Sequence, residues 1–243
     1  MLNVDPTQFA ELGYCLFPDI YDSDHVAAMQ HALGVATRAG FGELPSYYVE
    51  PHTTEVLWLE TCIHPRLLDA VESVLGPNLI LVFSSMFIKP TRDDKKVCWH
   101  QDNTYWPSVH GTDVVTVWLA IDDVLEENAP MQIIPRSHKG YQELPVTDAG
   151  EKDFLSRKVE VTAEQEASAV SLTMTAGSLS IHDSFLIHGS GINTSNRRRA
   201  GYTIRFCNTD TAWVDTETHP IPVYLVRGEA GPKGDRYVDL RPA

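Results

Sequence analysis

Long apolar runs are missing from this sequence. No stretch approaches about 18 consecutive apolar residues, so no membrane-spanning helix is expected. Basic residues are also few, since 19 lysines and arginines stand against 33 aspartates and glutamates and leave a net charge of −14. That charge repels nucleic-acid phosphates, so we expect no nucleic-acid partner. The N-terminus carries Asp5 and no basic segment, so no signal peptide is visible.

Cysteine is scarce as well, with 4 residues in 243. The four are widely scattered and form no Cys-x-x-Cys pair, which excludes a disulfide-rich framework. We therefore interpret them as reduced thiols of a cytoplasmic protein. They are Cys15, Cys62, Cys98 and Cys207.

The chain is long enough for a sizeable core, and we interpret residues 1–243 as a single domain. Helices are predicted early, over residues 7–12, 24–38 and 65–75, whereas 43–58 is ambiguous. From Leu79 onward β-forming residues dominate, separated by turn residues, which is typical of a sandwich or barrel with helices outside it. The strands expected are 13–18, 79–89, 114–121, 131–134, 170–175, 178–182 and 201–206. Residues 141–168 are polar and weakly patterned, which predicts a long loop or lid.

The motif Trp99-His100-Gln101-Asp102 is the main chemical signal. His100 and Asp102 are two residues apart, and on a β-strand this spacing puts both side chains on one face. An imidazole and a carboxylate on one face supply two of the three ligands of the two-histidine-one-carboxylate triad, which holds Fe(II) and leaves its other positions open. His188 is the best candidate for the third ligand. A single His-x-Asp is usually structural, so the assignment depends on the other motifs.

Several segments, in this order, resemble the phytanoyl-CoA dioxygenase family of Fe(II)/2-oxoglutarate oxygenases. They are Trp99–Asp102, Tyr105-Trp106-Pro107, Val117–Asp123, Ile134–Gly140 and His188-Gly189-Ser190-Gly191. The resemblance extends from Phe9 to about Phe206. It implies a mainly β protein, a double-stranded β-helix (cupin-like jelly roll) with flanking α-helices and a core at about residues 79–210. It also implies a hydroxylase that couples decarboxylation of 2-oxoglutarate to succinate and CO2 with hydroxylation of a substrate C–H.

The resemblance further implies which residues hold the cofactors Fe(2+), 2-oxoglutarate and O2. His100, Asp102 and His188 match the iron ligands, and the aspartate separates the chain from related halogenases. Arg199, eleven residues after His188, matches an arginine for the distal carboxylate of 2-oxoglutarate, which suits a bidentate cation. Ser190 matches a hydroxyl that helps to hold the same carboxylate.

Other residues of this expected site have an ordinary structural interpretation beside the functional one. Trp118 and Met86 match positions that contact the cofactor, yet both also suit the core of a buried strand. His182, six residues before His188, competes with it as a ligand, and we prefer His188 because of the Gly-Ser after it and the spacing to Arg199.

The substrate is expected to be a small, polar metabolite, since the acidic composition disfavours a CoA ester. The segment from Asn103 through Tyr105 to Trp106 is the candidate wall of its pocket. Arg205 could face the interior, where it would suit an anion-bearing substrate, although an outward, solvated arginine is about as plausible. The oligomeric state is beyond the sequence.

Two features depart from the family pattern. The turn at Asn128-Ala129 usually reads Asn-Gly, and no lysine precedes Ile88, which leaves an upstream cofactor contact unassigned, with Tyr47 or Tyr48 in its neighbourhood. Two other functions stay open, a non-catalytic or differently metallated cupin-like binding module and an oxidase of this fold that does not use 2-oxoglutarate. Arg199 discriminates against both, because neither needs a bidentate cation at that position.

Overall fold

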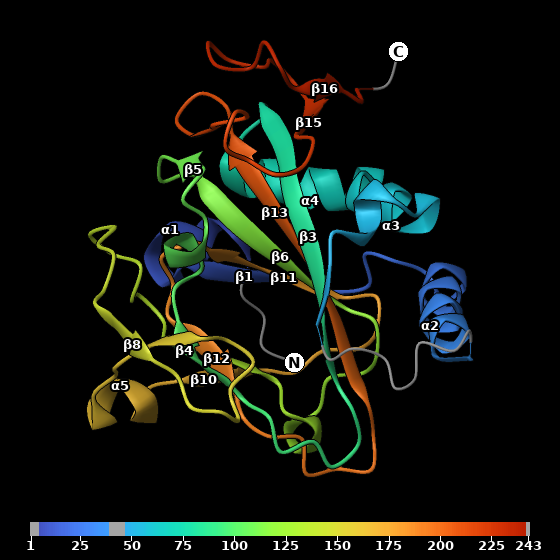
Figure 1. The fold of residues 1–243 in the computed structure, drawn as a ribbon, viewed down its shortest axis with the longest axis vertical. Coiled ribbons are helices and arrows are strands. Elements are labelled where there is room, and N and C mark those ends of the chain that lie inside the picture. The colour runs from blue at the N-terminus through green and yellow to red at the C-terminus, as the bar shows by residue number, and fades with distance from the viewer. Residues whose placement is uncertain (1–4, 39–46, 242–243) are drawn as a thin grey trace.

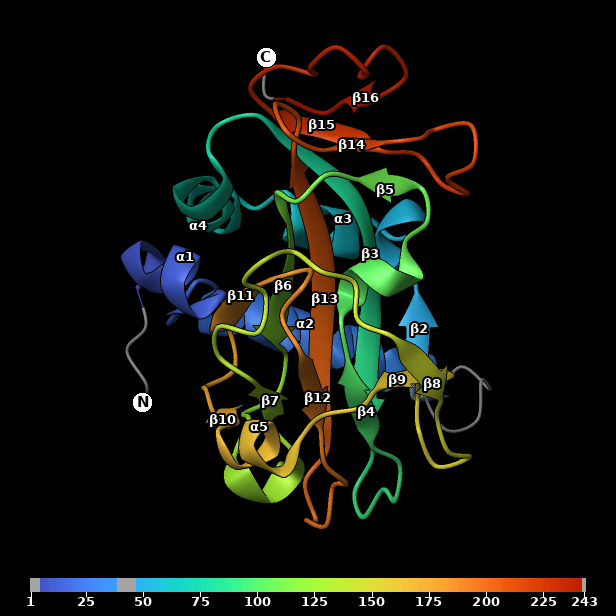
Figure 2. The same ribbon diagram turned by 90° about the vertical axis from the view of Figure 1, so that its left-hand side faces the viewer.

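Two β-sheets organise the computed structural model, which describes residues 5–38 and 47–241 (Figures 1 and 2). The eight-stranded sheet has the order β1 (Tyr14–Phe17), β11 (Leu179–Asp183), β6 (Val114–Ala120), β13 (Arg199–Asn208), β3 (Leu79–Lys89), β15 (Tyr224–Arg227) and β16 (Val238–Asp239), with β2 (Tyr47–Val49) also paired to β3. The four-stranded sheet has the order β10 (Val170–Leu172), β7 (Met131–Ile133), β12 (His188–Ser190) and β4 (Val97–His100). Strand pairing is antiparallel except between β15 and β16.

Shorter elements surround these sheets. Two small strand pairs join β5 (Val109–His110) to β14 (Trp213–Val214) and β8 (Val146–Asp148) to β9 (Arg157–Val159). The helices are α1 (Phe9–Leu12), α2 (Ser23–Arg38), α3 (Val56–Cys62), α4 (Pro65–Leu75) and α5 (Ala163–Ala167). Short 3-10 turns occupy η1 (Pro6–Gln8), η2 (Pro51–Thr53), η3 (Asp102–Tyr105) and η4 (Glu126–Asn128). None of the helices in the described ranges is long and apolar enough to cross a bilayer.

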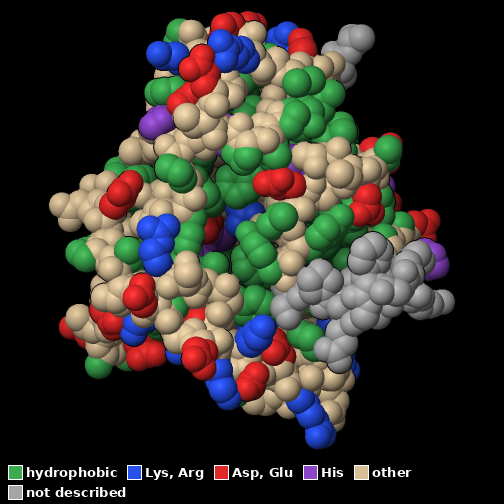
Figure 3. Space-filling model, viewed as in Figure 1, with side chains coloured by type: hydrophobic (Ala, Val, Ile, Leu, Met, Phe, Trp, Pro, Cys, Tyr) green, Lys and Arg blue, Asp and Glu red, His purple; other side chains and the backbone are tan. Residues whose placement is uncertain are grey.

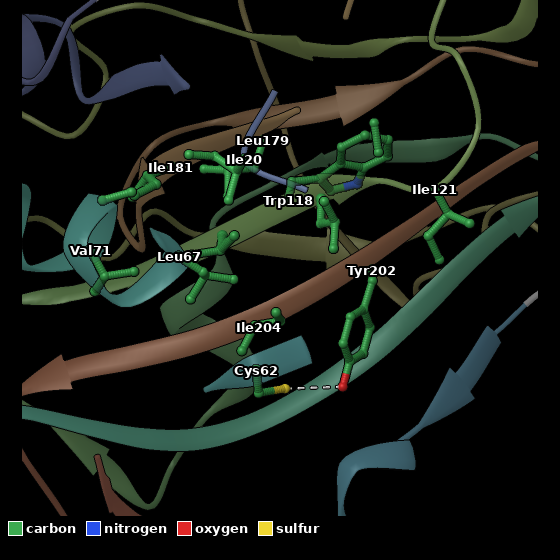
Figure 4. Close-up of a cluster of buried hydrophobic side chains, with 14 of the residues drawn as sticks. Ile20, Cys62, Leu67, Val71, Trp118, Ile121, Leu179, Ile181, Tyr202 and Ile204 are labelled. Carbon is green, nitrogen blue, oxygen red and sulfur yellow. Dashed lines mark hydrogen bonds between the residues drawn. The ribbon is translucent and has the colours of Figure 1, made fainter. Parts of the chain in front are cut away.

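The main core lies between the large sheet and the helices α3 and α4 (Figure 4). Pro65 at the start of α4 is compatible with a first helical turn, and Leu67 and Val71, four residues apart, point into the core from one face. Tyr202 of β13 reaches the same layer, where its hydroxyl lies 3.1 Å from the Cys62 sulfur. One face of the sheet therefore packs against these helices, and the site described below lies toward the small sheet.

Most of the predicted elements are confirmed, including the bounds of α4 and β3 and the start of strands near residues 114, 131, 170 and 179. The prediction of a long loop over 141–168 is wrong in part, because the short elements β8, β9 and α5 lie within that range. The undecided 43–58 stretch lies partly outside the described residues and otherwise contains β2, η2 and the start of α3. The large sheet also includes β1, β2, β15 and β16, which lie outside residues 79–210.

The altered turn at Asn128-Ala129 has a clear backbone correlate. Ala129 has a φ of 65°, in the left-handed region where glycine costs least, and this is the position where the Asn-Gly pattern carries its glycine. The Asn128 side chain accepts from the backbone N–H of Leu125 and donates to the Asp123 carbonyl, which closes the turn. The departure therefore changes the residue and leaves the turn itself formed.

Candidate metal and cofactor site

Three side chains meet between the two sheets. His100 ends β4, His188 begins β12, and the two are paired across the small sheet. Asp102 Oδ1 lies 3.6 Å from His100 Nε2 and 3.8 Å from His188 Nε2, and one donor atom from each residue lies within 4.8 Å of the others. The expectation that Asp102 shares a strand with His100 is wrong, since β4 ends at His100 and Asp102 opens η3. The turn nevertheless brings the carboxylate back beside both imidazoles.

Both histidines are oriented by backbone carbonyls. His100 Nδ1 donates to the Cys98 carbonyl and His188 Nδ1 to the Leu186 carbonyl, each over 2.9 Å. These bonds place the proton on Nδ1 and leave the Nε2 lone pairs directed at Asp102, the arrangement that metal-binding histidines require. Burial, together with the neighbouring histidines, lowers the pKa of His188 well below its usual range, so this imidazole is neutral at neutral pH.

The second carboxylate oxygen of Asp102 is held on the opposite side. Thr116 Oγ1, on β6, donates to Oδ2 over 2.5 Å. His182 Nε2 lies 3.5 Å from the same oxygen, but neither ring nitrogen of His182 makes a hydrogen bond. His182 therefore stands beside the group formed by His100, Asp102 and His188 and is not one of its three members. Only one oxygen of Asp102 is left free for a ligand.

The three consecutive arginines, Arg197, Arg198 and Arg199, lie in three different environments. Arg197 is exposed near Glu127, and Arg198 makes a bidentate pair with Asp122. Arg199 is 2% exposed, and no carboxylate within 4.0 Å is found for it among the described residues.

Arg199 lies against residues that the sequence also singled out. Its Nη2 donates to Ser190 Oγ over 3.3 Å, and its guanidinium lies 5.3 Å from the Trp118 ring centre. Its Nε has no partner. Burial lowers the pKa of Arg199 to about 10, which still leaves it charged. A buried cation with an unused donor requires an anion.

Lys89 is a second buried cation that the sequence analysis missed. It pairs across the sheet with Arg199, and its Nζ donates to the carbonyls of Lys95 and Gly191. Burial, reinforced by the charge of Arg199, lowers the pKa of Lys89 to about 7. The sequence did contain a signal for Lys89. It lies two residues after Phe87 on the same strand, so both side chains lie on the face of the strand that faces the site.

A pH-dependent stability follows for Lys89. The unfolded chain keeps this proton up to about pH 10.5, whereas the folded protein releases it near 7. The unfolded state therefore binds more protons within this window, so the lysine adds a rise in the free energy of unfolding as the pH increases. We expect Lys89→Met to lose that rise, measured by chemical denaturation at several pH values between about 7 and 10. Parallel pH curves for the two proteins would contradict the shifted pKa.

These residues surround one hollow with a volume of about 420 Å³. Both sheets contribute to its wall, and Figure 3 shows a hollow ringed by hydrophobic side chains with basic and histidine side chains in its depth. The lining residues are Phe87, Val97, His100, Asp102, Thr116, Trp118, Met131, His182, His188, Gly189, Ser190, Arg199, Thr203 and Arg205.

The remaining expected site residues are only partly brought together. Met86 does not line this hollow, because Phe87 faces it and Met86 therefore points to the other face of β3, where it is buried in the main core. Tyr105 and Trp106 line a second, adjoining cavity, whereas Asn103 lines neither. Arg205 lines the hollow itself. Neither Tyr47 nor Tyr48 is among the lining residues of either cavity.

The residues present fit a metal ion and a dicarboxylate. Two imidazole nitrogens and one carboxylate oxygen are the harder donors that suit non-haem Fe(II), and the unpaired Arg199 offers a counter-charge in the same hollow. The fold and these donors define a class of protein, the β jelly roll with a two-histidine-one-carboxylate site.

Comparison with known proteins places the chain within that class. A model of the phytanoyl-CoA dioxygenase (PhyH) family matches residues 9–201, so the chain belongs to the phytanoyl-CoA dioxygenase family. This family depends on Fe(II), 2-oxoglutarate and O2. The peroxisomal phytanoyl-CoA dioxygenase of Homo sapiens is 26% identical over 162 residues, 64% of this chain and 47% of that protein.

One further curated relative and one solved structure are similar to this chain. A probable alpha-ketoglutarate-dependent hypophosphite dioxygenase of Stutzerimonas stutzeri is 31% identical over 150 residues, 61% of this chain and 51% of that protein. The chain thus spans about half the length of these two curated relatives. The apo structure of the non-heme monooxygenase ThoJ superposes with a TM-score of 0.78 at 24% identity, over 97% of this chain and 87% of that one, and confirms the jelly-roll fold.

Proposed function

We propose that the chain is an Fe(II)- and 2-oxoglutarate-dependent dioxygenase that hydroxylates a C–H bond of a small, polar metabolite and releases succinate and CO2. The observation that carries the proposal is the meeting of His100, Asp102 and His188 in the same hollow as the buried, anion-free Arg199. Family membership supports the same conclusion.

Each residue of the hollow has a defined task in this proposal. His100 and His188 hold the metal through Nε2, and Asp102 holds it through Oδ1, because its Oδ2 is engaged by Thr116. Arg199 and Ser190 bind the distal carboxylate of 2-oxoglutarate.

The surroundings of these groups complete the mechanism. Trp118 packs beside the Arg199 guanidinium, and Phe87, Val97 and Met131 give the hollow an apolar wall that limits water. When bound, Fe(II) and 2-oxoglutarate supply the oxidising chemistry, in which one oxygen atom of O2 enters succinate and the other becomes the hydroxyl group of the product.

The proposal is tested by an anaerobic titration of the apo-protein with Fe(II) and then with 2-oxoglutarate. We expect the visible metal-to-ligand charge-transfer band of a chelated 2-oxo acid, saturating at one equivalent. If Fe(II) binds and no band forms, the oxygenase proposal fails, and the cupin-like binding module becomes the better explanation of the triad.

A positioning role for Thr116 follows from its bond to Asp102. Thr116→Val keeps the shape of the side chain but removes the donor to Oδ2, so the carboxylate can rotate. We expect a loss of Fe(II) affinity of about tenfold or more, measured by anaerobic metal titration. Thr116→Ser keeps a hydroxyl and should retain most of the affinity. Equal Fe(II) affinities of Thr116→Val and the parent protein would show that Thr116 does not position Asp102 for metal binding.

The compartment and partners are part of the same proposal. All four cysteines are free and buried, which suits a reducing cytoplasm. The net charge of −14 disfavours nucleic acid and anionic membrane surfaces as partners. We therefore propose a cytoplasmic enzyme, folded as a single domain, whose partner is its small-molecule substrate.

A further inference from the structure

Arg205 is a buried cation that the proposed reaction does not yet use. It lies on β13, six residues after Arg199, and lines the same hollow as the triad while being only 5% exposed. Among the described residues no carboxylate lies within 4.0 Å of it, because no ion pair includes it. Such a charge is costly unless something in the hollow pairs with it.

The neighbours of Arg205 fix its orientation without neutralising it. Its Nη1 donates to the hydroxyls of Ser85 and Thr203, over 2.6 and 2.5 Å, and these acceptors carry no charge. Its guanidinium lies over the rings of Phe83 and Trp106, at 4.8 and 5.6 Å from their centres. Its Nε is buried and has no hydrogen-bond partner. The Nη1 nitrogen of the guanidinium is thus engaged, and its Nε donor is still unused.

Charge balance in the hollow points to an additional anion. Asp102 is the only acidic residue among the described residues that line it. The two charges of Fe(II) and the charge of Arg199 are balanced by Asp102 and the two carboxylates of 2-oxoglutarate. Histidines bind a metal in their neutral form, so the positive charge of Arg205 is left over when metal and cosubstrate are bound. The loaded site therefore has room for one more negative charge.

A second cavity has in its wall the two aromatic rings that the Arg205 guanidinium contacts. It has a volume of about 1030 Å³ and is lined by Phe83, Tyr105 and Trp106 together with polar residues. Phe83 and Trp106 form an edge-to-face pair with ring centres 5.1 Å apart, and the Arg205 guanidinium contacts both rings. A molecule whose anionic end reaches Arg205 would have its body against this aromatic pair.

We propose that Arg205 binds a carboxylate of the substrate and so selects small carboxylic acids whose remaining part packs against Phe83 and Trp106. The inference rests on the proposed function, because it assigns the substrate class of that same site. The carboxylate accepts from the free edge of the Arg205 fork, and the Ser85 and Thr203 hydroxyls keep that fork in place.

The test uses the protein loaded with Mn(II) in place of Fe(II) and saturated with 2-oxoglutarate, whose own binding is measured first by calorimetry. Acetate is the probe and acetamide its uncharged match. The paramagnetic metal should enhance relaxation of the acetate methyl protons in a saturable way, with no saturable effect on acetamide. Arg205→Met should weaken acetate binding about tenfold or more while leaving 2-oxoglutarate binding unchanged.

Two further variants make the test specific. Arg157→Gln removes another arginine that packs over an aromatic ring, that of Tyr105, but does not line the hollow, and it should bind acetate as the parent does. Arg205→Lys keeps the buried charge and should bind acetate with intermediate affinity, which provides a second reading if Arg205→Met folds poorly.

The outcomes separate this inference from the function on which it rests. Failure of 2-oxoglutarate to bind the metal-loaded parent would overturn the proposed function and the inference with it. Normal 2-oxoglutarate binding without saturable acetate binding, or with equal binding of acetamide, would overturn the inference alone. So would acetate binding that is unchanged in Arg205→Met, or a loss of 2-oxoglutarate binding in that variant, which would assign Arg205 to the cosubstrate.

Discussion

Asp102→Ala is expected to abolish iron-dependent consumption of 2-oxoglutarate without unfolding the chain. The substitution removes the one carboxylate that, within residues 5–38 and 47–241, lies beside both His100 Nε2 and His188 Nε2. Two neutral imidazoles alone hold Fe(II) poorly, so the loss of metal affinity should exceed the roughly 10–100-fold that outer-shell substitutions cause. Anaerobic metal titration measures the affinity, and succinate release measures turnover.

The fold should tolerate this change because Asp102 lines the hollow and is not part of the main hydrophobic core. Asp102 is 5% exposed, and burial alone would raise its pKa, but its hydrogen-bonding neighbours and the charge of Arg205 keep that pKa well below its usual range. The melting temperature of the apo-protein should therefore fall by only a few degrees, with a cooperative transition retained. Full turnover in Asp102→Ala would show that the triad is assigned wrongly.

Asp183→Asn is the matched control. Asp183 is also a buried carboxyl on the large sheet, but burial raises its pKa to about 7, and its Oδ1 accepts from the Phe185 backbone N–H. Asparagine reproduces that acceptor and is neutral, so metal affinity should stay at the level of the parent protein. A parallel loss in both variants would indicate a general effect of altering buried carboxyls.

Arg199→Met is expected to weaken 2-oxoglutarate binding about 10–100-fold and to leave Fe(II) binding intact. The variant removes a charge-assisted pair that contributes roughly 1.5–3 kcal/mol. Methionine fills much of the space beside Trp118 and Ser190, so the wall of the hollow is kept. Titration of the charge-transfer band against 2-oxoglutarate gives the dissociation constant, and the preceding Fe(II) titration gives the metal affinity in the same sample.

Arg198→Gln is the control for this prediction, since it is adjacent in sequence and equally basic. Its guanidinium pairs with Asp122 outside the hollow, so 2-oxoglutarate affinity should not change even if some stability is lost. Equal weakening by both substitutions would mean that the basic run acts through general attraction, and Arg199 would lose its specific role.

Local patterns predicted the parts of the fold that local physics decides. The helix over 65–75 has Pro65 at its start, an apolar stripe and a glycine after its end, and the structure reproduces those bounds as α4. Strand β3 is a long run of β-forming residues and was predicted from Leu79 to Lys89. Both elements need no distant partner to be recognised.

Features that depend on distant partners were harder to predict. The three residues of β12 are too few to show a period, and this strand exists because β4 and β7 flank it. The face of Met86 is set by the register of β3 against β13, which the sequence does not display. The roles of Thr116 and Lys89 likewise arise only when strands from separate parts of the chain come together.

The candidate site was predicted more completely than the details around it. The resemblance implied roles for His100, Asp102, His188 and Arg199, and the structure brings all four into one hollow. The predicted conformation of Asp102 was wrong, because the prediction extended a strand through residue 102, where a 3-10 turn begins. That this turn still returns the carboxylate to the imidazoles is a consequence of tertiary packing.

Strand β13 carries side chains of both proposed binding functions on one face. Arg199 lies at its beginning, Thr203 in its middle and Arg205 next to a β-bulge toward its far end. These residues are separated by even numbers of positions, so all three side chains lie on the face that lines the hollow. The end of β13 that we propose for the cosubstrate is therefore separated along the strand from the end that we propose for the substrate. Substitutions at residues 203 and 205 could therefore change which substrates are accepted, while the metal ligands and Arg199 stay unchanged.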